Sequence, residues 1–386
     1  MDLDFTPEQE MIRDTYRRFC DKELTPEYVR WIDENCNFLP DDMLKKFAVL
    51  GTQGLTVPEE YGGQGLGMIE FSIVLEEISR KSVAAAFCVG GGLAFGARPL
   101  LDLGTPLLRE RHLPRIARGE EKWSLAMTEP GGGTDILGAI RTTAVRKGDR
   151  YVVNGSKQWI TAAHVADYMT TVVITDPAAP RKKGLSALII DARAPGVTVK
   201  PIPKLGIHGC GTNAVFFDDV EVPVENLLGT ENNGWYQLLN TLNPERIATS
   251  MFSLGLAHAA FDYALAYAKE RRAFGRPIGA FQILQHYLAD IAIEIHLSRN
   301  LIYRCAWLAD NGRPYNVEVA MAKIAACRAS ELAARHGMEI LGGYGFAMEY
   351  DMQRHFRDYK QMMFSPISDE MAKNYIAESF GLPRSF

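Results

Sequence analysis

The segments AMTEPGGGTD (Ala126–Asp135) and NGSKQWITAA (Asn154–Ala163) decide how this chain is interpreted. The first segment places Met127 and Thr128 ahead of three consecutive glycines, which Thr134 follows. Because glycines carry no Cβ, backbone N–H groups in such a turn can approach a ligand closely. The same pattern also occurs in plain β-turns that bind nothing, so the turn alone leaves both interpretations open.

The second segment is strand-like, with Trp159 and Thr161 two residues apart. Successive side chains of a strand alternate between its faces, so we expect these two on the same face. An indole and a hydroxyl on one face suit a flat heteroaromatic ring that needs a stacking partner and a hydrogen-bond donor. A tryptophan on a strand also commonly packs in a core, and this alternative stays open here.

Composition limits the number of domains and the kinds of partner. The chain has 386 residues, 47% of them hydrophobic and 23% charged, which is typical of a globular protein of two or three domains. Its formal net charge of -5 argues against a nucleic-acid partner, because such partners need a basic face. No apolar run approaches the roughly 20 residues of a membrane span, so we expect no span.

The first residues and the cysteines indicate a cellular compartment. The start, MDLDFTPEQE, is acidic and lacks the basic and apolar regions of a signal peptide. The cysteines lack the spacing of a metal site, so we expect reduced thiols that lie mostly in the core. They are Cys20, Cys36, Cys88, Cys210, Cys305 and Cys327. We therefore expect a cytoplasmic protein.

The order of the predicted elements gives the fold class. Helical spacing covers residues 1–121, beginning with Thr6 as an N-cap and Pro7 in the first turn. Alternating β-branched runs then fill residues 122–231 and predict a small barrel or sandwich. Helical spacing returns for residues 232–386. One block of strands between two helical blocks predicts an α+β protein of three domains, and the glycine run opens no βαβ unit, which excludes a Rossmann fold.

Two stretches of the first block differ in pattern. Residues 68–80 are expected to form an amphipathic helix, with one buried face and one polar face. Residues 84–95 are rich in small side chains, which predicts a tightly packed and buried helix.

Two C-terminal segments suit a phosphate-bearing ligand. In KERRAFGRPIGAFQ (Lys269–Gln282), Arg271 ends a helix. It could complement the helix dipole, or it could clamp a pyrophosphate through two parallel hydrogen bonds. In EILGGYGF (Glu339–Phe346), glycines interrupt a helix and allow a second backbone to approach.

These motifs together resemble the acyl-CoA dehydrogenase family. The resemblance also rests on VPEEYGGQG (Val57–Gly65) and on the run from Glu339 to Asp358, and it covers Leu3 to about Ala377. It implies an N-terminal helical domain, a middle β-domain and a C-terminal four-helix bundle. It further implies FAD as cofactor, an acyl-CoA substrate, electron-transferring flavoprotein as electron acceptor, and a homotetramer.

The resemblance also assigns positions to the cofactor and the substrate. Arg271, Phe274 and Gln282 correspond to the diphosphate and adenosine end of FAD. Ser368 and Glu370 correspond to positions that reach a flavin across a subunit interface. The other cofactor positions are Leu125, Met127, Thr128, Gly133, Thr134, Trp159, Thr161, Glu339, Leu341, Gly342 and Gly343. The substrate positions are Thr134, Asn243, Arg246 and the loop residue His208.

The family's usual catalytic carboxylate is missing from this chain. Family members carry a glutamate in a Tyr-Glu-Gly-Thr run after the C-terminal motif, whereas this chain has Pro366 at that position, within Ser-Pro-Ile-Ser. Relatives like the isovaleryl-CoA and long-chain dehydrogenases place their base directly before an arginine, where this chain has Glu245 before Arg246. The resemblance thus implies Glu245 as the base. We expect burial beside an apolar acyl group to raise its pKa towards neutrality.

With this base, the resemblance implies α,β-dehydrogenation of an acyl-CoA with a short, branched, cyclic or polar acyl group. Three alternatives stay open. Glu245 also suits a helix start, where the dipole favours an acidic side chain. The chain could be a catalytically silent scaffold subunit, because Pro366 accepts no proton. It could also be an enoyl-CoA reductase, or an enzyme of the same family that eliminates a leaving group.

Overall fold

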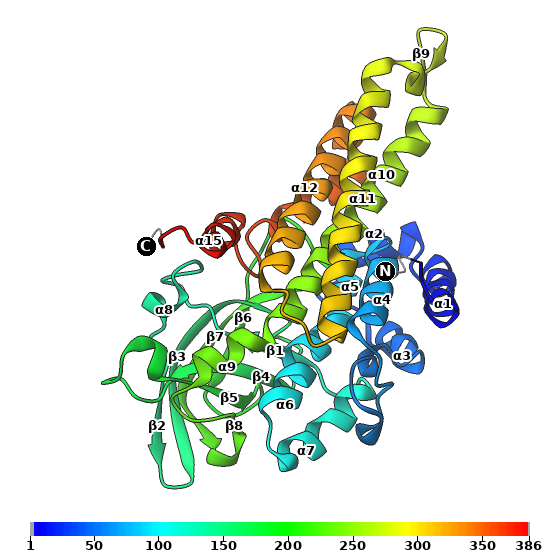
Figure 1. Cartoon of the computed structure of the whole chain (residues 1–386). Coiled ribbons are helices and arrows are strands. Elements are labelled where there is room, and N and C mark those ends of the chain that lie inside the picture. Colours follow the sequence, from blue (N-terminus) through cyan, green and yellow to red (C-terminus); the bar gives the residue numbers. More distant parts are fainter. Residues whose placement is uncertain (1–3, 385–386) are drawn as a thin grey trace.

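The computed structural model describes residues 4–384, except for the side chains of residues 239–241. Residues 1–3 and 385–386, which begin the first predicted domain and end the last, lie outside the described residues. In chain order, two groups of helices flank a mixed β-sheet, which confirms the predicted α+β fold of a helical, a β and a second helical block (Figure 1). The long helices form a rod that projects away from the sheet (Figure 1).

The first group contains seven α-helices, and their caps agree with the sequence. As predicted, Thr6 is the N-cap of the first helix; its hydroxyl accepts from the Gln9 backbone N–H, while the Gln9 side chain accepts from the Thr6 N–H. The helices are α1 (Pro7–Glu23), α2 (Pro26–Asn35), α3 (Asp41–Val49), α4 (Met68–Ser79), α5 (Val83–Gly91), α6 (Arg98–Leu103) and α7 (Pro106–Ala117). A π-helical stretch, η3 (Gly92–Ala97), joins α5 to α6 without a break.

Helix α4 is not amphipathic, and this prediction was wrong. All residues from Phe71 to Ser79 are buried, including Glu76 and Glu77. The polar side of the helix is covered because both carboxylates have partners on other helices. Glu77 accepts from the guanidinium of Arg17 at 2.7 Å. A sequence pattern alone cannot distinguish a carboxylate that meets water from one that meets an arginine.

The middle block forms one eight-stranded mixed sheet in the order β6-β7-β3-β2-β4-β5-β8, with β1 parallel to β4. Inward side chains of most strands meet in a separate hydrophobic core that includes Val153, Leu188 and Val215. The strands are β1 (Trp123–Ala126), β2 (Thr143–Lys147), β3 (Arg150–Thr161), β4 (Tyr168–Ile174), β5 (Leu185–Asp191), β6 (Val197–Pro201), β7 (Thr212–Pro223) and β8 (Leu227–Leu228). A short helix, α8 (Ile136–Ala139), follows β1.

Three long helices make up most of the C-terminal block, and α14 packs on two of them as a short fourth helix. At Gly255 in α10, an added Cβ would lie 2.2 Å from the Ser79 Cβ, so glycine permits the close crossing of α10 and α4. The elements are α9 (Gly234–Thr241), α10 (Asn243–Glu270), β9 (Arg272–Ala273), β10 (Arg276–Pro277), α11 (Gln282–Asp310), α12 (Asn316–Leu341), α13 (Gly343–Phe346), α14 (Met352–Met362) and α15 (Asp369–Ser379).

Two predictions about composition can be compared with the fold. The six cysteines are free and four of them are buried, as expected. The expectation about apolar runs is corrected, because the helical stretch Val83–Leu103 has the length and apolarity of a membrane span. Its most apolar window is 67% buried inside the protein, as is usual for a core helix.

Candidate active site

Glu245 lies in the first turn of α10, as the sequence predicted. The helix begins at Asn243, Pro244 follows, and the N-cap Leu242 provides no side-chain cap. Burial raises the pKa of Glu245 to about 7, and the nearby positive charge of Arg246 only partly opposes this effect. The residue nevertheless keeps some accessible surface, so it is not packed on all sides.

Among the residues that the structure describes, none forms an ion pair or a side-chain hydrogen bond with the Glu245 carboxylate. Thr249 donates to the Glu245 backbone carbonyl at 3.0 Å, not to the carboxylate. A carboxyl group with a pKa near 7 and no protein partner is suited to accept a proton at neutral pH. This geometry is expected of a general base.

A short hydrogen-bond chain holds Arg246 next to this carboxyl group. Its Nη1 donates to Asn243 Oδ1 at 2.6 Å, and Asn243 Nδ2 donates to Asn316 Oδ1 at 2.6 Å. Asn316 is the first residue of α12, so the chain ties the start of α10 to a second long helix. Burial lowers the pKa of Arg246 from its usual value, against the charge of Glu245.

The segment around Pro366 is held by structural contacts among the described residues. Lys323, which is fully buried on α12, donates to Asp369 at 2.6 Å and to the Met363 carbonyl at 3.0 Å. Ser368 caps α15 by accepting from the Met371 N–H. Both contacts fix the segment structurally. Glu370, predicted to reach a flavin, is exposed on the first turn of α15.

A buried ion pair stabilises the segment Met127–Thr134, which the resemblance assigns to the flavin and which is called the flavin loop below. Lys157 Nζ lies 2.8 Å from Glu129 Oε1 and also donates to the Met127 carbonyl at 3.2 Å. The Glu129 carboxylate accepts from two further backbone N–H groups, those of Arg141 and Thr142. The Gln158 N–H donates to the Thr128 carbonyl at 2.8 Å. These contacts hold Met127 and Thr128 against β3.

Trp159 does not follow the regular alternation of a strand, so its shared face with Thr161 stays a prediction. The β3–β7 register shifts between Lys157 and Ile160, and Trp159 has a φ of 64°. This left-handed conformation is rare for a large side chain and costs of order 1–3 kcal/mol. Ile160 is buried, Thr161 is half-buried and the indole is 57% exposed. A large exposed indole on a strained backbone is ready to stack on a ligand.

The glycine run is packed at Gly132 and open at Gly133. An added Cβ at Gly132 would lie 2.6 Å from the Ala139 Cβ, whereas one at Gly133 would have no neighbour within 4 Å. Asp135 accepts from the Gly138 N–H at 2.9 Å and caps α8. The predicted ligand contacts at Gly133 and Thr134 therefore lie on the open side of a fixed turn.

The structure brings together most of the predicted phosphate-end residues. A cleft of about 480 Å³ is lined by Arg271, Glu339, Leu341, Gly342 and Gly343, among others. The cleft lies at the far end of the helical rod, near β9 (Figure 1). Phe274 and Gln282 do not line it; Phe274 is 92% exposed.

This cleft and the flavin loop lie far apart within one chain. Arg271 follows Glu245 by 26 residues along the continuous helix α10, which corresponds to about 40 Å. Figure 1 shows the same separation, with β9 at one end of the molecule and β1 and β3 at the other. The chain therefore presents two separate parts of the predicted cofactor site.

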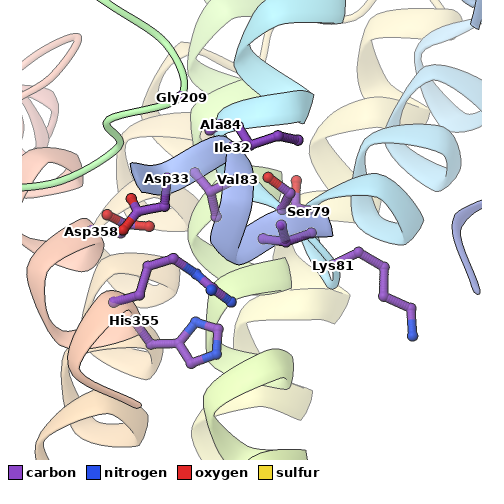
Figure 2. Close-up of a pocket in the computed structure, with 12 residues that line it drawn as sticks. Ile32, Asp33, Ser79, Lys81, Val83, Ala84, Gly209, His355 and Asp358 are labelled. Carbon is purple, nitrogen blue, oxygen red and sulfur yellow. The ribbon is translucent and has the colours of Figure 1, made fainter. Parts of the chain in front are cut away.

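His208 belongs to a polar cluster between its loop, α2 and α14. Its ring lies 3.6 Å from Asp33, and the Arg357 guanidinium lies between the same two side chains. Figure 2 shows Asp33 and Asp358 together beside Gly209. The cavity enclosed there has only about 10 Å³, space for roughly one water molecule. These contacts give His208 structural partners.

Sequence reasoning missed two residues of these sites, Lys157 and Asn316. Lys157 stands two residues before Trp159 in NGSKQWITAA, where a basic side chain on an inward strand position was a signal of a buried partner. Asn316 carried no local signal, because it lies 73 residues after Asn243, beyond the two long helices α10 and α11.

The comparisons with known proteins agree over the whole length. Sequence models of the acyl-CoA dehydrogenase N-terminal, middle and C-terminal domains match residues 6–120, 124–220 and 232–381. The chain is 38% identical to a probable acyl-CoA dehydrogenase, YngJ, of Bacillus subtilis (strain 168), over 98% of this chain and 99% of the relative.

Two other relatives extend this picture. The chain is 36% identical to the caffeyl-CoA reductase-Etf complex subunit CarC of Acetobacterium woodii, over 92% of this chain and 93% of the relative. A solved glutaryl-coenzyme A dehydrogenase in complex with glutaryl-CoA superimposes with a TM-score of 0.95 and 35% identity, over 100% of this chain and 98% of that one.

Proposed function

The chain belongs to the acyl-CoA dehydrogenase family, and from this premise we propose that it oxidises the Cα–Cβ bond of a short, branched, cyclic or polar acyl-CoA with Glu245 as the base. Members of this family are FAD-dependent oxidoreductases that act on CH–CH bonds. The observation that carries the assignment of the base is the carboxyl group of Glu245, which has a pKa of about 7 and no ion-pair partner among the described residues.

The residues present fit FAD. The exposed Trp159 indole and the braced Met127–Thr128 backbone suit the flavin ring, with Leu125, Gly133, Thr134 and Thr161 around them. Arg271 and the glycines of the distal cleft suit a diphosphate, because a guanidinium and exposed backbone N–H groups bind phosphate oxygens well. When bound, FAD supplies the acceptor for the hydride that leaves the substrate Cβ.

In the proposed reaction, Glu245 accepts the proton from the substrate Cα. The α-C–H of a thioester is a weak acid, so the base must be ionised and must lie next to this carbon. The Arg246 charge favours the ionised form of Glu245, and the Asn243–Asn316 chain keeps Arg246 beside it. The surrounding burial keeps the pKa high enough for effective proton transfer near neutral pH.

We also propose that a second copy of the chain completes the cofactor site. Arg271, Phe274 and Gln282 lie about 40 Å along the rod from Glu245, too far to serve the same flavin within one chain. Exposed apolar side chains on the rod, such as Phe274, Ile293 and Leu297, support an interface there. This arrangement supports the proposed homotetramer, in which Ser368 and Glu370 contact the flavin of a neighbouring subunit.

The remaining proposals concern partners and location. Electron-transferring flavoprotein is the proposed electron acceptor, supported by the printed name of the Acetobacterium relative, which is a subunit of a complex with Etf. The same name includes a reductase activity, so the opposite reaction direction is the second candidate for this chain. We propose a cytoplasmic location, which the composition and the free cysteines support.

Anaerobic mixing of the purified flavoprotein with a panel of acyl-CoA thioesters tests the proposal. We expect the flavin absorbance to bleach with at least one saturated thioester and the corresponding enoyl-CoA to form. If no saturated thioester bleaches the flavin but the pre-reduced enzyme turns over an enoyl-CoA, the result would favour the reductase. A chain that reacts with neither kind of thioester would be a scaffold.

A further inference from the structure

An apolar helix leads from the proposed base towards the flavin loop and leaves one strip of its surface accessible. In α5 and η3, the partly accessible residues include Phe87, Gly91, Ala94 and Phe95, spaced by four, three and one residues on one helical face. Of the residues between them, Val89, Gly90 and Leu93 are buried, whereas Cys88 and Gly92 are also partly accessible. The stretch is otherwise largely buried, and this apolar face is the part of it that one chain leaves incompletely covered.

The two ends of this strip contact the two halves of the proposed chemistry. Helix α5 packs on α10, and η3 packs on β1, the strand that leads into the flavin loop. An added Cβ at Gly91 would lie 3.7 Å from the Trp123 carbonyl of β1. The strip therefore runs between the helix that carries Glu245 and the strand that carries Leu125.

On α10, the face that carries Glu245 ends at an aromatic contact. Thr249 and Phe252 follow Glu245 by four and seven residues, so the three side chains lie along one face. The Phe252 ring packs on the Phe87 ring of α5, with centroids 4.3 Å apart. An added Cβ at Gly90 would lie only 3.6 Å from Phe252 Cζ. The two helices thus close on each other at this level.

We infer that Phe87 and Phe252 form the floor of the acyl pocket, about 10 Å along α10 from Glu245, and restrict the enzyme to short, uncharged acyl groups. This inference rests on the proposed function, because it takes Glu245 as the group that meets the substrate Cα. An acyl tail that starts at Glu245 and follows the strip meets the aromatic pair after two helical turns.

The strip also excludes a second charge on the acyl group. Its described residues, Phe87, Gly91, Ala94 and Phe95, are all apolar, and so is Phe252 opposite them. A carboxylate at the end of the acyl chain would lose its hydration there and meet apolar side chains, which is strongly unfavourable. This chain should therefore reject glutaryl-CoA, the ligand named for the similar glutaryl-coenzyme A dehydrogenase structure.

The test compares kcat/KM for butyryl-CoA, octanoyl-CoA and glutaryl-CoA in the FAD-loaded wild-type protein and in Phe252→Ala. We expect the wild type to prefer butyryl-CoA over each of the others by at least about tenfold, and Phe252→Ala to move the preference towards octanoyl-CoA by a similar factor. Phe252→Leu, which removes less volume, should move it in the same direction by less and carries the test if the alanine variant does not fold.

Two further variants separate pocket lining from general packing. Phe261→Ala removes the same side chain nine residues further along α10, on the opposite face, and should leave the chain-length preference unchanged. Gly91→Ala meets no atom closer than 3.7 Å and favours the helix, so the melting temperature should not fall. The same variant should lower kcat/KM for butyryl-CoA several-fold, because its methyl group enters the strip.

Equal wild-type activity on octanoyl-CoA and butyryl-CoA would overturn the inference while leaving the proposed dehydrogenase function intact. An unchanged preference in both Phe252 variants would also overturn it. A wild-type protein that reacts with no thioester in either direction would instead contradict the proposed function.

Discussion

Two buried glutamates, Glu245 at the start of α10 and Glu76 in the middle of α4, behave in opposite ways. Burial raises the pKa of Glu245 to about 7. Burial also acts to raise the pKa of Glu76, but His258, Arg299 and Tyr303 together lower it to about 2. Arg299 Nε lies 3.1 Å from Glu76 Oε1, and the Tyr303 hydroxyl donates to Oε2 at 2.7 Å. The partners, not the burial, separate a proton acceptor from a structural anion.

The largest expected effect follows from removing the proton acceptor. Glu245→Gln keeps the shape of the side chain, so we expect FAD content and folding to survive while turnover falls at least ~100-fold, the lower end of general base catalysis. Stopped-flow measurement of flavin reduction gives the rate. A variant that reduces its flavin at the native rate would show that the proton goes elsewhere, and Glu245 would then be only a helix-start residue.

The same substitution at Glu76, Glu76→Gln, should lower the stability of the fold and leave the turnover unchanged. A lowered pKa stabilises the fold above the unfolded value of 4.5, and this contribution is lost as the pH falls through about 2. Glu76→Gln should therefore reduce the free energy of unfolding at neutral pH by about 3 kcal/mol. Denaturant unfolding measures this loss. Turnover per bound flavin should stay near the wild-type value, and a hundredfold loss would contradict a structural role.

The pH dependence should distinguish the two carboxylates. Because Glu245 must be ionised to accept a proton and its pKa is about 7, kcat/KM should rise with pH through about 7. One pH unit below this midpoint, the rate should fall about tenfold below its value on the plateau. The measurement is single-turnover flavin reduction between pH 5.5 and 8.5, with unfolding followed in the same buffers. A flat profile across neutrality would contradict the assignment.

The raised pKa of Glu245 lowers the stability of the fold at neutral pH, whereas the lowered pKa of Glu76 increases it. Its neutral form is favoured in the fold, so the fold loses stability as the pH rises from the unfolded value of 4.5 to about 7. Glu245→Gln removes this loss. The variant should therefore unfold at the same or a higher denaturant concentration than the wild type at pH 8.

The smallest expected effect concerns the residue that positions Arg246. Asn316→Ala removes the acceptor for Asn243 Nδ2, a contact of 2.6 Å, and should cost about 1 kcal/mol. With Arg246 less firmly held, the midpoint of the pH profile should move upwards and turnover should fall a few-fold. Loss of activity with an unchanged midpoint would show that Asn316 acts only on packing.

Local chemistry made parts of this structure predictable from the sequence. The N-cap at Thr6, the helix start before Glu245 and the block of strands each follow from neighbouring residues. The raised pKa of Glu245 was also predicted, because Pro366 in place of the usual carboxylate indicated Glu245 as the base and burial was expected to raise its pKa. The domain boundaries at residues 121/122 and 231/232, and the roles of the individual site residues, stay predictions.

Features that depend on distant residues could not be predicted. Helix α4 was expected to have a polar face because the partner of Glu76, Arg299, lies 223 residues further along the chain. The register shift that turns Trp159 outwards depends on the pairing of β3 with β7. Motifs also carry no distances, so nothing in the sequence indicated that Arg271 and the flavin loop occupy opposite ends of the molecule.

The separation of those two ends along α10 has a genetic consequence. If each cofactor site takes its base from one subunit and its diphosphate arginine from another, two inactive proteins can restore each other. A mixed dimer of Glu245→Gln and Arg271→Ala chains contains one site with both defects and one site with neither. Coexpression of the two variants should therefore recover activity that neither shows alone, at up to about half of the wild-type level per mixed dimer. Substitutions at the two ends of the rod should thus complement each other within a mixed dimer.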